Sequence, residues 1–251
     1  MDLGLLGARV LVSGASRGIG RAIVAGFLAE GARVAAVARG REGLDRLGVD
    51  LDAPPDRLVT LAGDVGRPHE AVRLVTEADA ALGGVDVVCA NATANAEGAS
   101  EEEYAASFAV DLMQAVRLTD AARRLRPGSP LAVICTSSIV GKSGDTPHHA
   151  YGTMKAALLA WTKNAAVTYG PDGVRVNAVA PGAIFFEDGW WDHVRTSDPP
   201  LYEATLRNIP RGRMGSPEEV ANVVVFLASP RASHVNGATV LVDGGEHKGY
   251  A

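Results

Sequence analysis

Cysteine is scarce in this sequence. The chain of 251 residues contains two cysteines, Cys89 and Cys135, and each lies inside an apolar run with strand character. Two isolated thiols of this kind are too few for a disulfide framework or a zinc cluster. We therefore expect two buried, free thiols and no metal site.

Long apolar runs and an excess of positive charge are also missing. No uncharged segment approaches the length of a membrane-spanning helix, and Met1-Asp2-Leu3 lacks the basic start of a signal peptide. The formal net charge of −5 argues against a surface for nucleic acid or for an anionic membrane. These absences predict a cytoplasmic protein that binds neither nucleic acid nor membrane.

Aromatic residues make up only 5% of the chain, so any local concentration of them is informative. By contrast, a hydrophobic fraction of 47% and 29 glycines fit a globular protein with many tight turns. No break in composition divides the chain. The length and composition therefore predict one large α/β domain spanning residues 1–251.

Apolar runs with strand character alternate with helical segments. We expect strands at 8–13, 33–38, 57–62, 85–90, 131–136 and 174–180, and helices at 21–30, 68–82, 101–125 and 151–169. This alternation predicts a parallel sheet covered by helices on both faces, which is a three-layer α/β/α sandwich. Ligands of such sheets bind beyond the carboxyl ends of the strands. The residues at those ends are Gly14, Arg39, Asp64, Asn91, Ser138 and Pro181.

A glycine-rich segment joins the first strand to the first helix. It reads Gly14-Ala15-Ser16-Arg17-Gly18-Ile19-Gly20. Glycines let the backbone turn sharply and approach a pyrophosphate, which then lies at the positive end of the helix. A lone glycine triplet also occurs in ordinary turns, but strand, loop and helix in this order predict a Rossmann-type dinucleotide-binding domain.

The end of the second strand indicates which dinucleotide is preferred. NAD sites carry a carboxylate there for the ribose hydroxyl, whereas the 2′-phosphate of NADP needs cations. This chain has Arg39 and no acid, and Arg17 in the glycine-rich segment could reach the same phosphate. NADP(H) is therefore favoured over NAD(H). The alternative is that both arginines are solvated surface charges.

Tyr151 and Lys155 are spaced by one helical turn, so a phenol and an ammonium can converge on one face of a helix. A neighbouring ammonium favours the phenolate, as acid–base chemistry near neutral pH requires. Ser138, thirteen residues before Tyr151, could hold the oxygen of a carbonyl or an alcohol. Together the three residues predict proton transfer to or from such an oxygen.

These segments resemble the short-chain dehydrogenase/reductases over nearly the whole chain, and most of all their 3-oxoacyl-carrier-protein reductase branch. The further matching segments are Asp64-Val65, Asn91-Ala92, Ser137-Ser138, Asn177-Ala178-Val179-Ala180-Pro181-Gly182 and Val242-Asp243-Gly244-Gly245. The resemblance implies a seven-stranded parallel sheet. It also implies a homotetramer assembled through the long helices and the C-terminus.

The resemblance further implies roles for the site residues. Tyr151 would be the proton donor or acceptor, Lys155 would strengthen it as an acid and hold the nicotinamide ribose, and Ser138 would orient the substrate oxygen. Asp64-Val65 would meet the adenine, and Asn91 would stabilise the central strand. The implied cofactor contacts are Gly14, Ser16, Arg17, Gly18, Ile19, Gly20, Arg39, Asp64, Val65, Asn91, Ala92, Tyr151, Lys155, Pro181, Gly182 and Ile184.

Three residues depart from the family's pattern. Asp111 replaces the fourth catalytic residue, a helix asparagine that helps to hold a water beside the active-site lysine. We count Asp111 as catalytic through its backbone carbonyl, and we expect its carboxylate to favour the protonated Lys155 and to alter the pH profile. Thr93 replaces a glycine and either crowds the cofactor or points away from it. Phe186 replaces a threonine that usually touches the cofactor.

Residues 183–215 break the strand–helix alternation and correspond to the family's variable substrate lid. The segment concentrates Phe185, Phe186, Trp190, Trp191 and Tyr202 in a chain otherwise poor in aromatics. At least two of these rings are expected to anchor the lid on the core or to build a subunit interface. The others predict an apolar pocket for a ring-containing or acyl substrate.

Two other groups have ordinary structural explanations. His148 and His149 come just before Tyr151 and could line the entrance of the site, but we expect them to be solvated loop residues. The arginines near the end of the helix at 101–125 could dock an acidic carrier protein, but complementing the helix terminus and solvent is the preferred explanation. These arginines are Arg123, Arg124 and Arg126.

The leading hypothesis is an NADP(H)-dependent enzyme that interconverts a secondary alcohol and a ketone, such as a 3-oxoacyl, polyketide or ring ketone, with Tyr151 as acid and base. One alternative is an NAD-linked alcohol dehydrogenase. Another is a cofactor-binding protein without turnover, which the three departures suggest and the intact Ser138, Tyr151 and Lys155 oppose. The motifs do not name the substrate, because specificity depends on the lid.

Overall fold

A computed structural model of the chain describes residues 2–96, 98–144 and 148–249. Seven strands form one sheet in the order β3-β2-β1-β4-β5-β6-β7. All neighbouring strands are parallel, so their carboxyl ends share one edge of the sheet. The strands are β1 (Arg9–Ser13), β2 (Arg33–Ala38), β3 (Leu58–Ala62), β4 (Val87–Ala90), β5 (Leu131–Thr136), β6 (Val174–Pro181) and β7 (Thr239–Val242).

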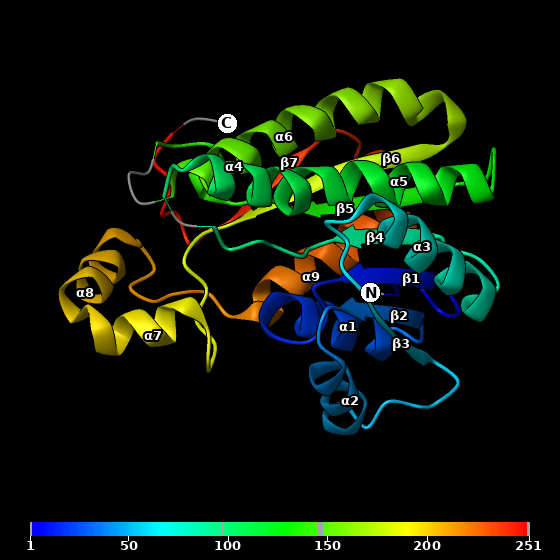
Figure 1. Cartoon of the computed structure of the whole chain (residues 1–251), viewed down its shortest axis with the longest axis horizontal. Coiled ribbons are helices and arrows are strands. Elements are labelled where there is room, and N and C mark those ends of the chain that lie inside the picture. Colours follow the sequence, from blue (N-terminus) through cyan, green and yellow to red (C-terminus); the bar gives the residue numbers. More distant parts are fainter. Residues whose placement is uncertain (1, 97, 145–147, 250–251) are drawn as a thin grey trace.

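Helices cover both faces of the sheet (Figure 1). The helices whose side chains share one buried apolar cluster are α1 (Gly18–Ala29), α2 (Arg41–Asp50) and α9 (Pro217–Ala228). Those of the opposite cluster are α3 (Pro68–Leu82), α5 (Met113–Leu125) and α6 (His149–Tyr169). The predicted single-domain, three-layer α/β/α sandwich with a seven-stranded parallel sheet is confirmed.

The apolar strands are explained by burial on both faces. In β1, Val10 and Val12 belong to the cluster under α1, whereas Leu11 belongs to the cluster under α3 and α5, and all three are fully buried. A strand covered on both sides reads as a continuous apolar run rather than an alternating one. Cys89 and Cys135 are free and buried, as predicted. Burial raises the pKa of the Cys135 thiol to about 12.

The predicted helix at 101–125 has the expected ends but not a regular interior. α4 (Glu101–Ser107) passes into α5 through a π-helical turn, Phe108–Leu112. A π turn inserts one residue into the helix and is frequent at functional sites. Asp111 lies in this turn and its side chain is fully buried. The apolar pattern on either side is undisturbed, so the sequence predicted one regular helix.

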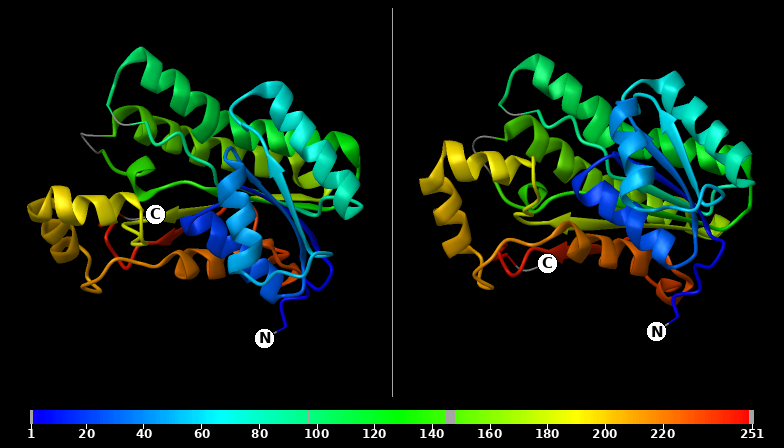
Figure 2. Two further views of the ribbon diagram at one scale, coloured as in Figure 1. Left: turned by 60° about the horizontal axis from the view of Figure 1, so that its bottom comes forward. Right: turned by 90° about the horizontal axis from the view of Figure 1, so that it is seen from below.

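Residues 183–215, called the lid below, contain two short helices that the sequence pattern did not indicate. They are α7 (Trp190–Ser197) and α8 (Pro199–Asn208). Both project to one side of the molecule, beyond the sheet, in every view (Figures 1 and 2). Three lid rings pack in a small cluster within the lid, so the expectation that at least two of the rings anchor the lid on the core or build a subunit interface stays a prediction. The cluster consists of Ala183, Ile209 and Met214 with Phe185, Trp191, Tyr202 and Leu206.

Other boundaries differ by a few residues. α1 begins at Gly18 rather than at 21. α2 was not predicted because polar residues and glycines dominate its sequence and only Leu44 and Leu47 are buried. In the described part of the chain, no helix combines the length and the apolar character needed to cross a bilayer.

Candidate active site

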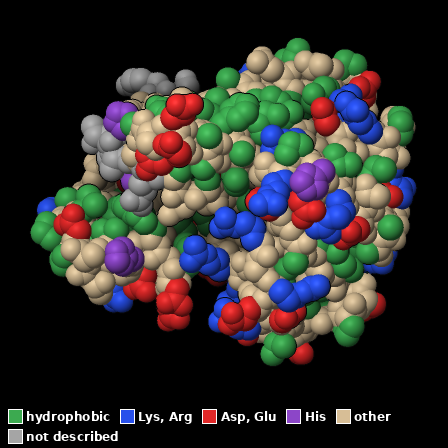
Figure 3. All heavy atoms as spheres, in the orientation of Figure 1, with side chains coloured by type: hydrophobic (Ala, Val, Ile, Leu, Met, Phe, Trp, Pro, Cys, Tyr) green, Lys and Arg blue, Asp and Glu red, His purple; other side chains and the backbone are tan. Residues whose placement is uncertain are grey.

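The predicted site residues gather along the carboxyl edge of the sheet. They follow the strands in turn: Gly14–Gly20 after β1, Arg39 after β2, Asp64-Val65 after β3, Asn91-Ala92 after β4, Ser138 after β5, and residues 181–184 at the end of β6. The strand order reverses between β1 and β4, where ligands of open α/β sheets bind. Figure 3 shows the surface hollowed between the lid and α1, with Lys and Arg side chains on the α1 side.

Asn91 joins the end of β4 to the glycine-rich turn. Its Nδ2 donates to the carbonyl oxygens of Ser13 (3.2 Å) and Gly14 (3.4 Å). The buried Ser13 hydroxyl accepts from the Asn91 backbone N–H (3.0 Å) and donates to Gln114 Oε1 (2.7 Å). Sequence reasoning missed Gln114, because an isolated amide on a long helix carries no motif. This network holds the turn's backbone in place.

The start of α1 fits the pyrophosphate of a dinucleotide. The first N–H groups of a helix lack partners within the helix, and the positive end of its dipole favours an anion. The first turn, Gly18–Arg21, contains no acid that would compete for those groups. Arg17 and Arg39 are exposed beside this turn, after β1 and β2, and so present cations to a ligand there.

Lys155 is the buried centre of the acid–base group. Its side chain is 2% exposed, and its Nζ donates to the carbonyl oxygen of Thr136 at 2.9 Å. The same nitrogen lies 3.3 Å from Asp111 Oδ1 and 5.4 Å from the centre of the Tyr151 ring. The ammonium thus sits between a carboxylate and the phenol with which it shares a face of α6.

Asp111 reaches Lys155 with its own carboxylate. This agrees with the charge that we expected the carboxylate to add near Lys155, whereas the role of the Asp111 backbone carbonyl in holding a water stays a prediction. Its Oδ2 accepts from Ser107 Oγ (2.8 Å) and from the backbone N–H of Ala94 (3.4 Å), which leaves Oδ1 facing Lys155. Burial lowers the pKa of the Lys155 ammonium, but the charges of Asp111 and Tyr151 outweigh it, so the pKa lies above its ordinary value.

Ser138 is held beside this pair by a turn that packs on α6. It precedes a 3₁₀ turn, Ile139–Gly141, and its hydroxyl accepts from the backbone N–H of Val140 (3.2 Å). A Cβ on Gly141 would come within 2.7 Å of the Lys155 carbonyl carbon, so only glycine allows this close approach. The Ser137 hydroxyl also donates to the Lys155 carbonyl oxygen (3.0 Å).

His148 belongs to the site rather than to a solvated loop, so that expectation is wrong for it. Its ring packs edge-on to Tyr151, with centroids 6.2 Å apart, and to Trp190, 5.4 Å apart. Trp190 packs in the same way on Trp191, at 4.5 Å. A row of aromatic edges therefore leads from Tyr151 into the lid. His149, by contrast, is exposed at the start of α6.

Glu246 at the base of the lid was not predicted, because 63 residues separate it from its partner. Its carboxylate accepts from the backbone N–H of Ala183 at 2.8 Å, where the chain leaves β6 for the lid. Burial is the main cause of the raised pKa of Glu246. Thr93 has its own explanation: its side chain is exposed and its hydroxyl accepts from the Asn95 N–H (3.1 Å), so it points away from the core.

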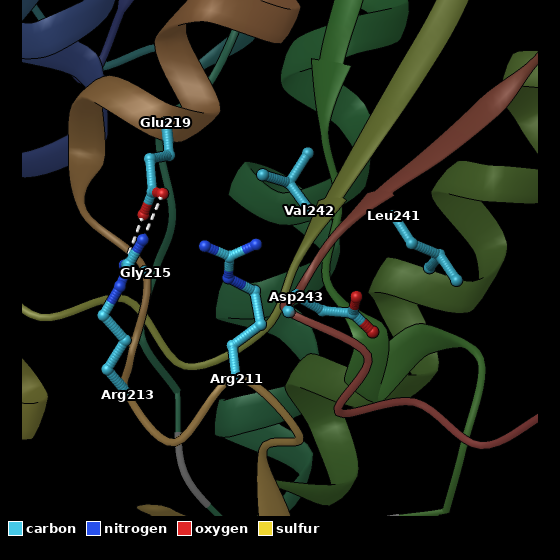
Figure 4. A pocket seen from close by; sticks show the side chains of 8 residues that line it. Arg211, Arg213, Gly215, Glu219, Leu241, Val242 and Asp243 are labelled. Carbon is cyan, nitrogen blue, oxygen red and sulfur yellow. Dashed lines mark hydrogen bonds and ion pairs between the residues drawn. The ribbon is translucent and has the colours of Figure 1, made fainter.

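A separate depression lies where the lid meets the end of β7 (Figure 4). Arg211 points into it beside the ion pair of Arg213 and Glu219, whose charged atoms lie 2.7 Å apart. None of the residues that line this depression belongs to the predicted site. In the described ranges, no group of three or more His, Cys, Asp or Glu side chains could hold a metal ion.

Two of the three arginines near the end of α5 make internal contacts. Arg123 pairs with Asp172 (2.8 Å) and stacks on the Tyr169 ring (3.7 Å). Arg126 pairs with Asp79 (2.6 Å). These contacts favour the structural explanation of this cluster over the docking of a carrier protein.

Comparisons with known proteins agree with this architecture. A family model described as Enoyl-(Acyl carrier protein) reductase matches residues 14–247. Isoepoxydon dehydrogenase of Penicillium expansum is 40% identical over 99% of this chain and 98% of its own length. L-xylulose reductase of Bos taurus is 37% identical, with 98% of each chain covered. A short chain dehydrogenase from Burkholderia cenocepacia, solved in complex with NADP, superposes with a TM-score of 0.87 at 28% identity, covering 96% of this chain and 98% of the other.

Proposed function

The chain belongs to the short-chain dehydrogenase/reductase family of oxidoreductases, and we propose that it interconverts a ketone and a secondary alcohol with NADP(H). The observation that carries this proposal is the placement of Lys155, buried between Asp111 and Tyr151. A buried ammonium is a costly feature unless it is paired or put to use. Here it stabilises the phenolate of Tyr151.

The chain's own residues supply the proton chemistry. In reduction, Tyr151 donates its phenolic proton to the substrate carbonyl oxygen, and Ser138 orients that oxygen through a hydrogen bond. Lys155 stabilises the phenolate that remains, and in oxidation the phenolate accepts the proton of the alcohol. NADP(H), when bound, would supply the hydride for the carbonyl carbon in reduction or take it up in oxidation.

The residues at the carboxyl edge would hold the cofactor. The backbone at the start of α1 would bind the pyrophosphate, Arg17 and Arg39 the 2′-phosphate, and Lys155 the nicotinamide ribose. The related dehydrogenase solved with NADP supports this choice of dinucleotide. The further proposed contacts are Gly14, Ser16, Gly18, Ile19, Gly20, Asp64, Val65, Asn91, Ala92, Tyr151, Pro181, Gly182 and Ile184.

The substrate is proposed to be a small, free molecule with an apolar or ring-containing part. His148 places an aromatic edge next to Tyr151, and Trp190 packs on the His148 ring from the lid. Two relatives are named for isoepoxydon and for L-xylulose, neither of which is a carrier-bound acyl group. Arg123 and Arg126 are also engaged within the chain. We further propose that the enzyme works as a homotetramer in the cytoplasm.

Steady-state kinetics with NADPH and NADH, over a panel of cyclic and acyclic ketones and alcohols, tests this function. We expect kcat/KM with NADPH to exceed that with NADH by at least about tenfold. NADH has no 2′-phosphate, so the charge-assisted contacts proposed for Arg17 and Arg39 would not form with it. Tyr151→Phe should lower kcat by about 10²–10⁴-fold, the usual range for a lost general acid. Its Kd for NADPH, measured by calorimetry, should rise by less than about tenfold, because only one of the many proposed cofactor contacts is lost.

Two results would contradict the proposal in different ways. A clear preference for NADH would overturn the roles of Arg17 and Arg39 and favour an NAD-linked alcohol dehydrogenase. Tight binding of either cofactor without turnover on any substrate would favour the non-catalytic alternative.

A further inference from the structure

The beginning of the lid lies directly on the glycine-rich turn. A Cβ built on Gly18 would meet three atoms of the Phe186 ring at 2.7–3.0 Å. The ring therefore covers the α-carbon of Gly18, the residue at which α1 begins. Phe186 is also the residue that replaces the family's threonine.

A second contact ties the same part of the lid to the same turn. Arg17 Nη1 donates to the carbonyl oxygen of Asp188 at 3.2 Å. Asp188 has a φ of +57°, in the left-handed region that a residue other than glycine adopts only when its surroundings hold it there. Its own N–H donates to Asp192 Oδ2 (3.1 Å) in the first turn of α7. We call residues Phe186–Asp188 the strap.

The strap and a dinucleotide need the same surface. The middle glycine of such a turn is small so that the backbone can approach the pyrophosphate. At Gly18 this approach is already occupied by the Phe186 ring. A pyrophosphate that approached Gly18 from this side would meet the ring, so binding there would require the ring to move off Gly18.

We propose that the strap competes with the cofactor for the glycine-rich turn, so that Phe186 sets the cofactor affinity of this enzyme and Arg17 links release of the strap to the 2′-phosphate. The inference rests on the proposed cofactor. Arg17 holds the strap through one bond to a neutral, exposed carbonyl. A phosphate dianion is the stronger acceptor for a guanidinium. NADP(H) thus removes both strap contacts, whereas NAD(H) removes only the contact of the ring.

Calorimetric titration with NADPH and with NADH tests the proposal through binding rather than turnover. The variants are Phe186→Thr and Phe186→Ala, which remove the ring, with Phe186→Tyr as the matched control that keeps it. We expect Kd for both cofactors to fall about five- to tenfold in the first two variants, since displacing one packed ring costs about that factor. Phe186→Tyr should bind like the wild type.

The arginine is tested separately. Arg17→Ala should lower Kd for NADH, because it frees the strap, and raise Kd for NADPH, because it removes a phosphate contact. Fluorescence adds a second readout, since only Gly189 separates the strap from Trp190 and Trp191. NADPH should change the emission of the wild type, and Phe186→Thr should show part of that change before any cofactor is added.

The outcomes separate this inference from the proposed function. The competition would be overturned if the wild type binds a cofactor and both Phe186→Thr and Phe186→Ala bind it equally well or more weakly. Equal binding would mean that the ring has no effect on the cofactor, and weaker binding would mean that the ring holds the cofactor in place. A fall in Kd for NADPH with Arg17→Ala would overturn the link to the 2′-phosphate. If the wild type and every folded variant bind neither cofactor, the proposed function fails and the inference fails with it.

Discussion

Among single residues, Asp111 changes the chemistry of the site most directly. An asparagine at this position would bring no charge to the lysine, but Asp111 places a carboxylate oxygen 3.3 Å from the Lys155 ammonium. Both side chains are almost fully buried, so solvent screens the attraction only weakly. The lysine therefore keeps its proton to a higher pH than an ordinary lysine does.

Replacing Asp111 tests this effect on activity. Lys155 is protonated below its pKa, and the wild-type pKa is raised, so the alkaline limb of the kcat/KM profile set by this group lies at a higher pH than an ordinary lysine would give. In Asp111→Asn the carboxylate charge that raises the Lys155 pKa is gone, while burial still lowers that pKa. The alkaline limb of the kcat/KM profile should therefore move to lower pH by about one unit or more. The measurement is kcat/KM against pH. Superimposable curves for the two proteins would contradict the charge effect.

The same variant has a predicted effect on stability. Breaking a buried ion pair leaves one charge uncompensated, so Asp111→Asn should lose about 3–5 kcal/mol of unfolding free energy near neutral pH. The pair's contribution is fully present below the unfolded pKa of lysine and disappears as pH rises through the raised folded pKa. The difference between the two proteins should therefore shrink in strongly alkaline solution. Asp120→Asn is the matched control, since Asp120 lies 3.8 Å from Arg123 in a partly exposed pair.

At the level of secondary-structure elements, α6 and α7 meet through aromatic contacts beside the proposed substrate site. α6 carries Tyr151 and Lys155, and α7 begins with Trp190. His148, which precedes α6, bridges them by packing edge-on to both Tyr151 and Trp190. Movement of α7 would therefore change the aromatic surface beside Tyr151, the proposed proton donor.

Trp190→Ala should alter substrate selection rather than cofactor binding. Loss of a ring that contacts an apolar substrate should raise KM for cyclic ketones by about tenfold, with little effect on small acyclic ones. Kd for NADPH should remain within about twofold of the wild type. Tyr202→Ala is the control, because Tyr202 packs in the lid's own cluster and its loss should lower Tm without changing substrate preference. An unchanged preference in Trp190→Ala would remove this ring from the pocket.

For the molecule as a whole, the parallel sheet brings six short segments to one edge. Each segment is separated from the next by a helix that returns the chain to the opposite edge (Figure 1). The opposite ends of the strands do not contribute to the site. This arrangement leaves the outer faces of the helices available for assembly.

A homotetramer is the expected assembly. Exposed apolar side chains remain on the long helices, including Phe108 (45% exposed) and Val167 (72% exposed). Light scattering should give the mass of four 26.0 kDa chains, and Val167→Glu should give a smaller species, because a charge in an apolar interface is costly. Val49→Glu is the control, since Val49 is 80% exposed on α2, outside the long helices. A wild-type mass of one chain would contradict the expectation.

The sequence by itself predicted the layers of the fold and the chemistry of the site. Strand burial, helix periodicity and the glycine-rich turn are patterns of a few neighbouring residues, and local geometry follows from them. The spacing of Tyr151 and Lys155 is equally local, since it needs only one turn of helix. The parallel sheet then required all strand-end residues to share one edge.

Only the tertiary structure decided which distant residues meet at that edge. The contacts of Asp111 with Lys155, of Phe186 with Gly18 and of Glu246 with Ala183 each join segments far apart in the chain. The π turn that accompanies Asp111 leaves the helical pattern around it intact, so no local signal reveals it. Such contacts depend on how whole elements pack against one another. The sequence around a side chain does not determine how far it lies from a residue on another element. For this reason the sequence predicts a hydride and proton transfer, whereas the structure shows which side chains surround the groups proposed to carry it out.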